Sequence, residues 1–483
     1  MQSPNFLRPW QNVYKREPVG CSTAIMALFL FSIAFVLYSV IPFLGIAFVS
    51  LIIFLVGIFK IEYLFYALVS VSFFHAWDID FSAYGGSGSI GFLNTVNAPV
   101  ADFLAVAIFV SLFFSWLLRI RKIDFARLKK VWLVFFVYGL FLLVAFISSR
   151  SAYGGLIVES TDYLLRPLIF IAIVYLILPI LIIKNKETFM NVLYFWFGTG
   201  ILIAIYGFLS LFLDYGVGWI GLHPFVLFNN FAPLGVNHNA IGEALVTILP
   251  LGFYLWYAKK RVWIGAFTIF ILLISIATLS RSALVSILVS FTTLAYIYRQ
   301  KIKEFLPKNF FVWTVISVIL LVPIVWYISI FLSTNIVKSS NDSRLEMSKI
   351  AFFYIKEEPL LGHGPGTFIY MLADTEIFRY EYGDPVDSHG IIQKILLEEG
   401  VVGLLIFALF VYFILRYLWE AFSKAKKDDN KYLLLALFIM VISSLTFQLF
   451  STSYFKAVLW LPLGISLTVT VFYLNSSLYD SKK

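Results

Sequence analysis

The chain has 483 residues, of which 61% are hydrophobic and only 13% are charged. This balance excludes an ordinary soluble domain, and the apolar residues come in blocks of about 17–25, the length that crosses a bilayer. The single cysteine, Cys21, excludes an internal disulfide and a cysteine-based metal cluster, and the net charge of +9 fits basic cytoplasmic loops better than nucleic-acid binding.

Predicted membrane spans begin soon after the N-terminus. The uncharged stretch 22–58 is too long for a signal peptide or for one crossing, so we expect it to be retained as two spans broken near Pro42. Further spans are predicted at 62–77, 101–118, 131–148, 166–183, 190–213, 239–258, 262–279, 282–298, 309–333, 400–418, 432–449 and 457–475. The expected fold is an all-α polytopic membrane protein with about 12–14 transmembrane helices.

The distribution of Lys and Arg sets the orientation. With both termini in the cytoplasm, most of the 36 basic residues lie in cytoplasmic loops, as the positive-inside rule requires. The long polar loop 334–399 then faces outwards, as do shorter loops at 78–100, 149–165 and 214–238. Four parts are expected along the chain: N-terminal helices, helices that enclose an outer hairpin, an extracytoplasmic loop with short helices, and C-terminal helices, at 1–220, 221–333, 334–399 and 400–483.

The loop 334–399 concentrates reactive side chains in an otherwise apolar sequence. A protein that only transports or only scaffolds has little need for such a loop, whereas an enzyme that works at the membrane surface does. Its candidate residues are Arg344, His363, Glu381, Asp384, Asp387 and His389.

Arg281 lies in the segment Thr278-Leu-Ser-Arg-Ser-Ala283, at an outer hairpin between two apolar spans. A charge at the bilayer centre costs about 2.5–3.5 kcal/mol on insertion scales. One interpretation is a snorkelling arginine, whose guanidinium group reaches the membrane–water interface. The other is an anion clamp, because the planar guanidinium fork suits phosphate, and on the outer face we expect that phosphate to belong to a lipid carrier.

Two further arginines are candidates for the same anion. Arg344 begins a stretch of helical periodicity that ends at Pro359, and it is either on the solvated face of a surface helix or a second cation for a diphosphate. Arg166 follows Glu159 and Asp162, and it is either paired with one of them or a further phosphate ligand.

His389 is the candidate general base. Asp387 or Ser388 is predicted to cap the following helix, which would place His389 in its first turn and Gln393 one turn later. The dipole at a helix N-terminus disfavours the imidazolium, so the ring would stay neutral and able to accept a proton. The alternative is an inert loop histidine.

Four residues are predicted to support this site. Gln393 is one; His363 lies between Gly362 and Gly364 and is alternatively part of a tight turn with positive φ. Asn237 and His238 precede a span, and the alternative is that this segment merely caps the helix through Asn237 or Asn239. No metal is expected, because the five histidines are scattered and form no H-x-x-x-H pattern.

The order of these motifs resembles that of the O-antigen ligase and O-antigen polymerase superfamily. The resemblance covers about residues 225–410. It is carried by Asn237-His-Asn-Ala-Ile-Gly242, Leu279-Ser-Arg-Ser-Ala283, Ser343-Arg344, Pro359-Leu-Leu-Gly-His-Gly-Pro-Gly-Thr-Phe368, Ser388-His-Gly390 and Glu399-Gly-Val-Val-Gly403.

The resemblance implies a function at a bacterial cytoplasmic (inner) membrane. A glycan would pass from an undecaprenyl diphosphate carrier to a hydroxyl of a glycan or glycolipid acceptor, on the periplasmic or outer face, without metal or cofactor. By similarity, His389 would deprotonate the acceptor. Arg281, helped by Arg344 or Arg166, would hold the diphosphate leaving group.

Two alternatives stay open at this point. Ligases commonly carry another arginine shortly before the segment that matches Asn237–Gly242, but residues 221–236 contain no Lys or Arg. Either Arg166 or Arg344 takes its place, or the chain is a polymerase that extends the lipid-linked glycan. A flippase or transporter would instead need charges near the middle of several spans, and the predicted spans are nearly free of charge.

Overall fold

The computed structural model describes residues 42–74, 78–80, 97–213, 234, 238–300, 335–382, 387–425, 428–451 and 456–480. The spans predicted before Pro42 and at 309–333 lie outside these residues, as do Asn237 and Asp384. The described chain divides into two compact units. Unit 1 comprises the described residues within Met1–Leu64, Asp80–Asn97 and Val106–Arg121, and unit 2 comprises those within Phe65–Ile79, Ala98–Ala105 and Lys122–Lys483.

Unit 1 contains most of α2 (Pro42–Val71) and of α3 (Val100–Leu117). The rings of Phe54 and Phe114 meet edge to face, with centroids 5.5 Å apart. Arg121 forms an ion pair with Glu62 at 2.9 Å. The backbone of α2 breaks at Lys60, with φ −139° and ψ 55°, which is where one predicted span ends and the next begins.

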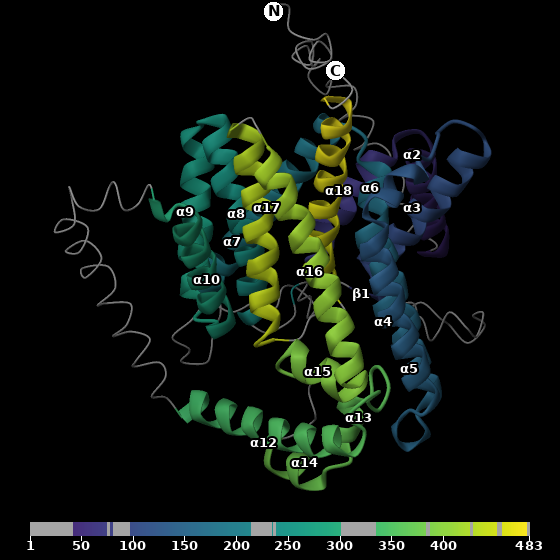
Figure 1. The fold of residues 1–483 in the computed structure, drawn as a ribbon, viewed down its shortest axis with the longest axis vertical. Coiled ribbons are helices and arrows are strands. Elements are labelled where there is room, and N and C mark those ends of the chain that lie inside the picture. Colours follow the sequence, from purple (N-terminus) through teal and green to yellow (C-terminus); the bar gives the residue numbers. More distant parts are fainter. Residues whose placement is uncertain are drawn as a thin grey trace, which may run out of the picture. The chain divides into compact units, whose positions relative to one another are not determined.

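Unit 2 holds most of the apolar helices (Figure 1). These are η4 (Phe125–Val131), α4 (Trp132–Arg150), α5 (Ile157–Tyr163), η6 (Leu164–Phe170), η7 (Ile173–Ile177), α6 (Leu178–Ile182), α7 (Lys186–Leu213), α8 (His238–Lys259), α9 (Val262–Ala277), α10 (Arg281–Ile297), α16 (Gly400–Lys424), α17 (Asp428–Gln448) and α18 (Ala457–Asp480). The described residues also contain two short strands, β1 (Asp78–Asp80) and β2 (Asn97–Pro99), which pair in a two-stranded sheet.

The prediction of an all-α polytopic membrane fold is confirmed. Within the described ranges, eight helices are long and apolar enough to cross a bilayer, and α9, α10 and the apolar part of α18 form a group of shorter apolar helices. The helical bounds follow the apolar blocks of the sequence closely. Long apolar runs leave the backbone no polar partners except its own, so helix formation is their only solution in lipid.

One predicted boundary is wrong. The span expected at 166–183 begins nine residues earlier, because the helical backbone runs from Ile157 through Ile182 and takes up much of the outward loop predicted at 149–165. The π-helical turns η6 and η7 lie in its middle, and η6 contains Pro167. A proline removes one backbone donor, and a wider turn keeps the helix continuous at this point.

An aromatic core joins α4, α16 and α18. The rings of Tyr138, Phe410 and Trp460 contact one another, with centroids 5.1–5.9 Å apart. Tyr138 also donates a hydrogen bond to the carbonyl of Leu168 at 2.7 Å. Gly464 lets α18 approach the backbone of η7 so closely that a Cβ would overlap the carbonyl oxygen of Tyr175. This packing holds α4, α16 and α18 together, and α16 directly follows the loop 335–399.

The loop 335–399 folds on its own small core at one end of unit 2. It consists of α12 (Asn335–Glu357), α13 (Phe368–Ala373), α14 (Glu376–Tyr382) and α15 (Ile391–Glu398), and Figure 1 shows these helices together, away from the end of unit 2 at which α18 finishes. Their shared core consists of Met347, Ala351, Phe368, Met371, Leu372, Phe378 and Leu397. The prediction of short helices within this loop is therefore correct.

Candidate active site

The turn before α10 fixes the position of Arg281, the first residue of that helix. Leu279 adopts a left-handed backbone conformation with φ 51°, and the Ser280 side chain caps α10. Ser280 Oγ also donates a hydrogen bond to Asn239 Oδ1 at 2.6 Å. Gly242 permits the close approach of α8, because a Cβ there would lie 3.1 Å from the Cβ of Ser280. The segment from His238 to Gly242 thus supports the arginine hairpin.

A second arginine stands close to the first. Arg281 Nη1 donates a hydrogen bond to Asn341 Oδ1 on α12, and Arg344 follows Asn341 by three residues on the same helix. Burial and the positive charge of Arg281 lower the pKa of Arg344 to about 10. The Nε atom of Arg344 is buried and has no hydrogen-bond partner among the described residues. Two guanidinium groups therefore share one region, and neither forms an ion pair with a carboxylate of the described chain.

His389 completes this group. Its ring is half-buried, and its pKa falls from 6.5 to about 4. The causes are burial first, then the charge of Arg344 and then that of Arg281, while Asp387 acts in the opposite direction. The ring is consequently neutral at pH 7. Residues from α10 and α12 thus act electrostatically on His389 in the segment before α15.

The predicted cap at His389 is wrong. Helix α15 begins only at Ile391, after an extended Gly390, so His389 precedes the helix and does not lie in its first turn. The Ser388 hydroxyl bonds to the backbone of Gly390 at 2.8 Å and 3.2 Å. The Asp387 carboxylate contacts Lys394 instead of capping. Burial and the arginines, rather than a helix dipole, keep the imidazole neutral.

Gln393 and His363 connect the elements around the site. Gln393 Nε2 donates to the carbonyl of Met347 at 3.3 Å and so joins α15 to α12. His363 is buried, and its ring Nε2 lies 2.9 Å from the carbonyl oxygen of Tyr354. Its backbone N–H donates to the carbonyl of Leu397 at 2.9 Å. These contacts join the turn that contains His363 to α12 and to α15.

The glycines around His363 form the predicted turn. Gly362, Gly364 and Gly366 have φ values of 72°, 100° and 77°, which side chains rarely tolerate. A Cβ at Gly362 would lie 2.6 Å from the backbone of Glu398. The turn therefore packs directly on the end of α15, and glycine is required for the approach as well as for the backbone conformation.

The predicted ion pair of Arg166 has a different partner. Its guanidinium contacts Asp102 Oδ2 at 2.9 Å, instead of Glu159 or Asp162. The Arg166 side chain is 54% exposed. Arg166 therefore differs from Arg344, whose charge has no carboxylate partner among the described residues. His238 begins α8 and is half-buried.

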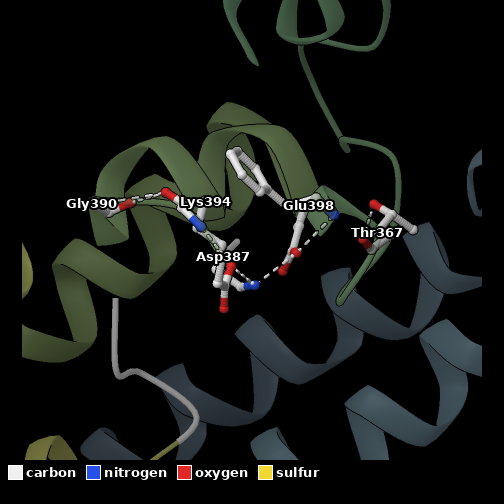
Figure 2. A network of polar contacts seen from close by, with 8 residues as sticks. Thr367, Asp387, Gly390, Lys394 and Glu398 are labelled. Carbon is white, nitrogen blue, oxygen red and sulfur yellow. Dashed lines mark hydrogen bonds and ion pairs between the residues drawn. The ribbon is translucent and has the colours of Figure 1, made fainter. Parts of the chain in front are cut away.

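Two buried polar groups were missed by sequence reasoning. Lys394 on α15 is fully buried, and its Nζ lies 2.6 Å from Asp387 Oδ1 and 3.1 Å from Glu398 Oε1 (Figure 2). On α8, the buried Glu243 accepts a hydrogen bond from Gln448 Nε2 at 2.6 Å. The Lys–Glu spacing of four residues and a lone carboxylate in an apolar span were the available signals.

Comparison with known families agrees with this geometry. Residues 264–408 match the family model described as O-antigen ligase, and this range includes Arg281, Arg344 and His389. The chain contains an O-antigen ligase family domain. The expected resemblance to the O-antigen ligase and polymerase superfamily is therefore confirmed for this part of the chain. The O-antigen ligase family domain begins within α9 and ends within α16, so it covers the Arg281 hairpin, the loop 335–399 and His389. No curated protein matches the chain.

Proposed function

We propose that this protein transfers a glycan from an undecaprenyl diphosphate carrier to an acceptor hydroxyl at the extracytoplasmic face of a bacterial cytoplasmic membrane. The observation that carries the proposal is the convergence of Arg281, Arg344 and His389 on one half-buried site. These residues come from three elements that are far apart in sequence. The O-antigen ligase family domain supports a lipid-linked glycan as the class of substrate.

The arginines would act on the leaving group. When the bond between the anomeric carbon and the diphosphate breaks, negative charge grows on the departing oxygen. Arg281 and Arg344 have no carboxylate partner in the described chain, so their donors are available to that charge. Fixed donors in a site with little water stabilise such charge without reorganising. A metal ion is not required for this step.

His389 would activate the acceptor. The neutral imidazole takes the proton of the acceptor hydroxyl, whose oxygen attacks the anomeric carbon as the diphosphate leaves. A single displacement of this kind inverts the anomeric configuration. The bound diphosphate would also offset the two positive charges that lower the pKa of His389. The donor therefore makes the base stronger at the moment when it is needed.

The orientation of the loop is a separate part of the proposal. We expect 334–399 to face outwards and both termini to face the cytoplasm. Ser348 on α12 and Ser423 near the end of α16 are exposed and suit cysteine labelling in a Cys21→Ser background. A membrane-impermeant maleimide added to intact cells should label Ser348→Cys and not Ser423→Cys. Labelling of both from the same side would contradict the orientation.

A second candidate function is polymerisation of the glycan on its own carrier. The observation that favours it is the lack of Lys and Arg in residues 221–236, where ligases commonly carry an arginine. Both reactions use the same chemistry and differ in the acceptor. The product of one assay therefore separates them, since a polymerase lengthens the lipid-linked glycan and a ligase attaches it to another molecule.

The decisive experiment is glycan transfer by the purified protein in detergent, with an undecaprenyl diphosphate-linked oligosaccharide and EDTA. Wild type should transfer the glycan, His389→Ala should not, and Lys424→Met at an exposed site on α16 should behave as wild type. No transfer by wild type with several donors and acceptors, together with translocation of the carrier in liposomes, would replace the proposal with a flippase.

A further inference from the structure

Lys394 is a positive charge with no exposure to solvent, next to the site rather than in it. Its Nζ forms ion pairs with Asp387 at 2.6 Å and with Glu398 at 3.1 Å, and it stands 4.9 Å from the centre of the Tyr163 ring (Figure 2). Burial alone would lower the pKa of Lys394, but the charges of Asp387 and Glu398 hold it well above its ordinary value. The charged form of Lys394 is thus favoured, and its ammonium group contacts groups on three segments.

Glu398 anchors this network to the rest of the loop. The Glu398 side chain is fully buried, and its Oε1 accepts a hydrogen bond from the backbone N–H of Phe368 at 3.2 Å. Phe368 begins α13 directly after the glycine turn. The Lys394 ammonium group is therefore held against α15, α13 and α5, which are parts of unit 2 with well-packed side chains.

Asp387 connects the network to His389. The same Oδ1 atom that contacts Lys394 also accepts a hydrogen bond from Ser388 N at 2.8 Å. At the other end of this segment, the backbone N–H of Lys394 donates to the carbonyl of Gly390 at 3.1 Å. His389 lies between these two attachment points, and both of them lead to the same lysine.

We infer that Lys394 is a positioning residue for His389, which acts by holding Asp387 and so fixes the segment 387–390 against α15. The inference rests on the proposed function of His389 as the general base. Lys394 itself cannot touch a substrate because it has no exposed surface. Its effect passes through one carboxylate, whose position decides where the imidazole stands relative to Arg281 and Arg344.

The network also affects the electrostatic environment of the His389 imidazole. In the described chain, the charged groups that act on the imidazole are Arg344 on α12, Arg281 on α10 and Asp387 on its own segment. Asp387 is the one that favours the protonated ring. Lys394 thus holds in place the carboxylate that partly balances the arginines.

The test compares Lys394→Met with two further variants. Methionine is unbranched and of similar length, but it has no charge. The triple variant Lys394→Met, Asp387→Asn and Glu398→Gln removes the cation and the charges of both carboxylates, so no buried charge is left without its partner. Lys424→Met, which removes another lysine paired with a glutamate four residues away but at an exposed site, is the matched control.

Three quantities are measured on each variant. The first two are kcat and KM for a lipid-linked donor. The third is the rate at which diethyl pyrocarbonate modifies His389, followed by peptide mass spectrometry, with His363 as the internal reference. The modification is measured well below the melting temperature of each variant, and it needs no turnover.

For Lys394→Met we expect kcat to fall at least tenfold, KM for the donor to stay within about twofold, and His389 to be modified severalfold faster. The triple variant should regain thermal stability but keep the low kcat and the fast modification. Recovery of kcat together with stability would overturn the inference, as would a wild-type modification rate in Lys394→Met.

Two controls keep the result interpretable. If Lys394→Met does not fold, Asp387→Asn alone leaves Lys394 paired with Glu398, and it should give the same fast modification of His389. A wild-type modification rate there would also overturn the inference. If His389→Ala retains transfer, the proposed base fails, whereas the modification rates still decide whether Lys394 positions the histidine.

Discussion

Two charged clusters meet at the segment 387–390. One contains a cation paired with carboxylates, and the other contains cations that form no ion pair with a described carboxylate. In the Lys394 network, one fully buried ammonium contacts two carboxylates. In the site formed by Arg281, Arg344 and His389, the charge of Arg281 lowers the pKa of Arg344, and both arginines lower the pKa of His389. No carboxylate of the described chain forms an ion pair with either arginine. The first cluster pairs its cation with carboxylates of the fold, whereas we propose that an anion of the substrate balances the second.

This difference separates structural charge from functional charge. A folded protein gains nothing from two partly buried cations side by side, because burial and mutual repulsion both raise their free energy. The Lys394 network has a structural role, because Glu398 attaches α15 to the segment that follows the glycine turn. The arginine pair has no carboxylate partner among the described residues, which is why we propose that it binds a ligand with at least two negative charges.

The largest expected effect belongs to His389. His389→Ala should lower kcat by about 10²–10⁴-fold, which is the usual contribution of a general base. The same substitution removes a ring that is only half-buried, so the thermal stability of the protein should change little. Transfer rates and melting curves of the purified variant check both statements. Activity within tenfold of wild type would show that the base lies elsewhere.

The next prediction compares how much each cluster contributes to the free energy of unfolding. Lys394→Met leaves buried carboxylates without their cation and should destabilise the fold by about 3–5 kcal/mol. Arg344→Gln removes a cation that has no carboxylate partner in the described chain and should change stability by less than about 1 kcal/mol. Unfolding in detergent, followed by a thermal or denaturant scan, measures both. Equal losses for the two variants would contradict the distinction between the clusters.

Arg281→Lys keeps the charge but loses the planar fork. We expect kcat to fall by about 10²-fold, the usual cost of one donor to a developing negative charge. Correct folding should persist, because Ser280 and Asn239, rather than the arginine, fix the hairpin. The measurement is kcat with the lipid-linked donor, beside the melting temperature. Wild-type activity would remove the clamp from the mechanism.

Much of the fold was predictable because it rests on local sequence. Apolar blocks of membrane length give helices regardless of tertiary context, and α8 and α16 begin within a residue of their predicted starts. The grouping of Arg281, Arg344 and His389 was predictable for another reason. These polar residues were predicted to lie on the same side of the membrane, and the order of their motifs matched a known family.

The remainder depends on contacts that sequence spacing does not reveal. The cap predicted at His389 fails because the Asp387 carboxylate contacts Lys394, whose side chain is seven residues away along the chain. Arg166 pairs with Asp102, 64 residues before it, although two acidic residues are much closer in sequence. In both cases a tertiary partner replaced the local one. Local rules assign a side chain correctly only when no distant group competes for it.

The pH dependence of transfer offers a smaller but directional test. Neutral His389 is the active form, so activity is lost as the pH falls through its pKa. In the free enzyme that value is about 4, held down by burial and the two arginines. Arg344→Gln removes one cation, and the acidic limb of kcat/KM should therefore move upwards from about 4 towards 6.5. The pH profile of kcat/KM reports the free enzyme, and a downward shift would contradict the electrostatic account.

The smallest expected effect is that of Arg166, our third proposed phosphate ligand. Its charge is balanced by Asp102, and its side chain is 54% exposed, so water and the carboxylate already satisfy it. An exposed ion pair contributes about 0–1 kcal/mol, and Arg166→Gln should lower kcat by no more than about threefold if Arg344 supplies the second cation. Asp102→Asn is the matched control, because it frees Arg166 without removing it. If Arg166→Gln instead matches Arg281→Lys in its loss of transfer, while Asp102→Asn raises transfer, then Arg166 leaves its carboxylate for the diphosphate. The division between balanced and unbalanced cations would then hold only before the donor binds.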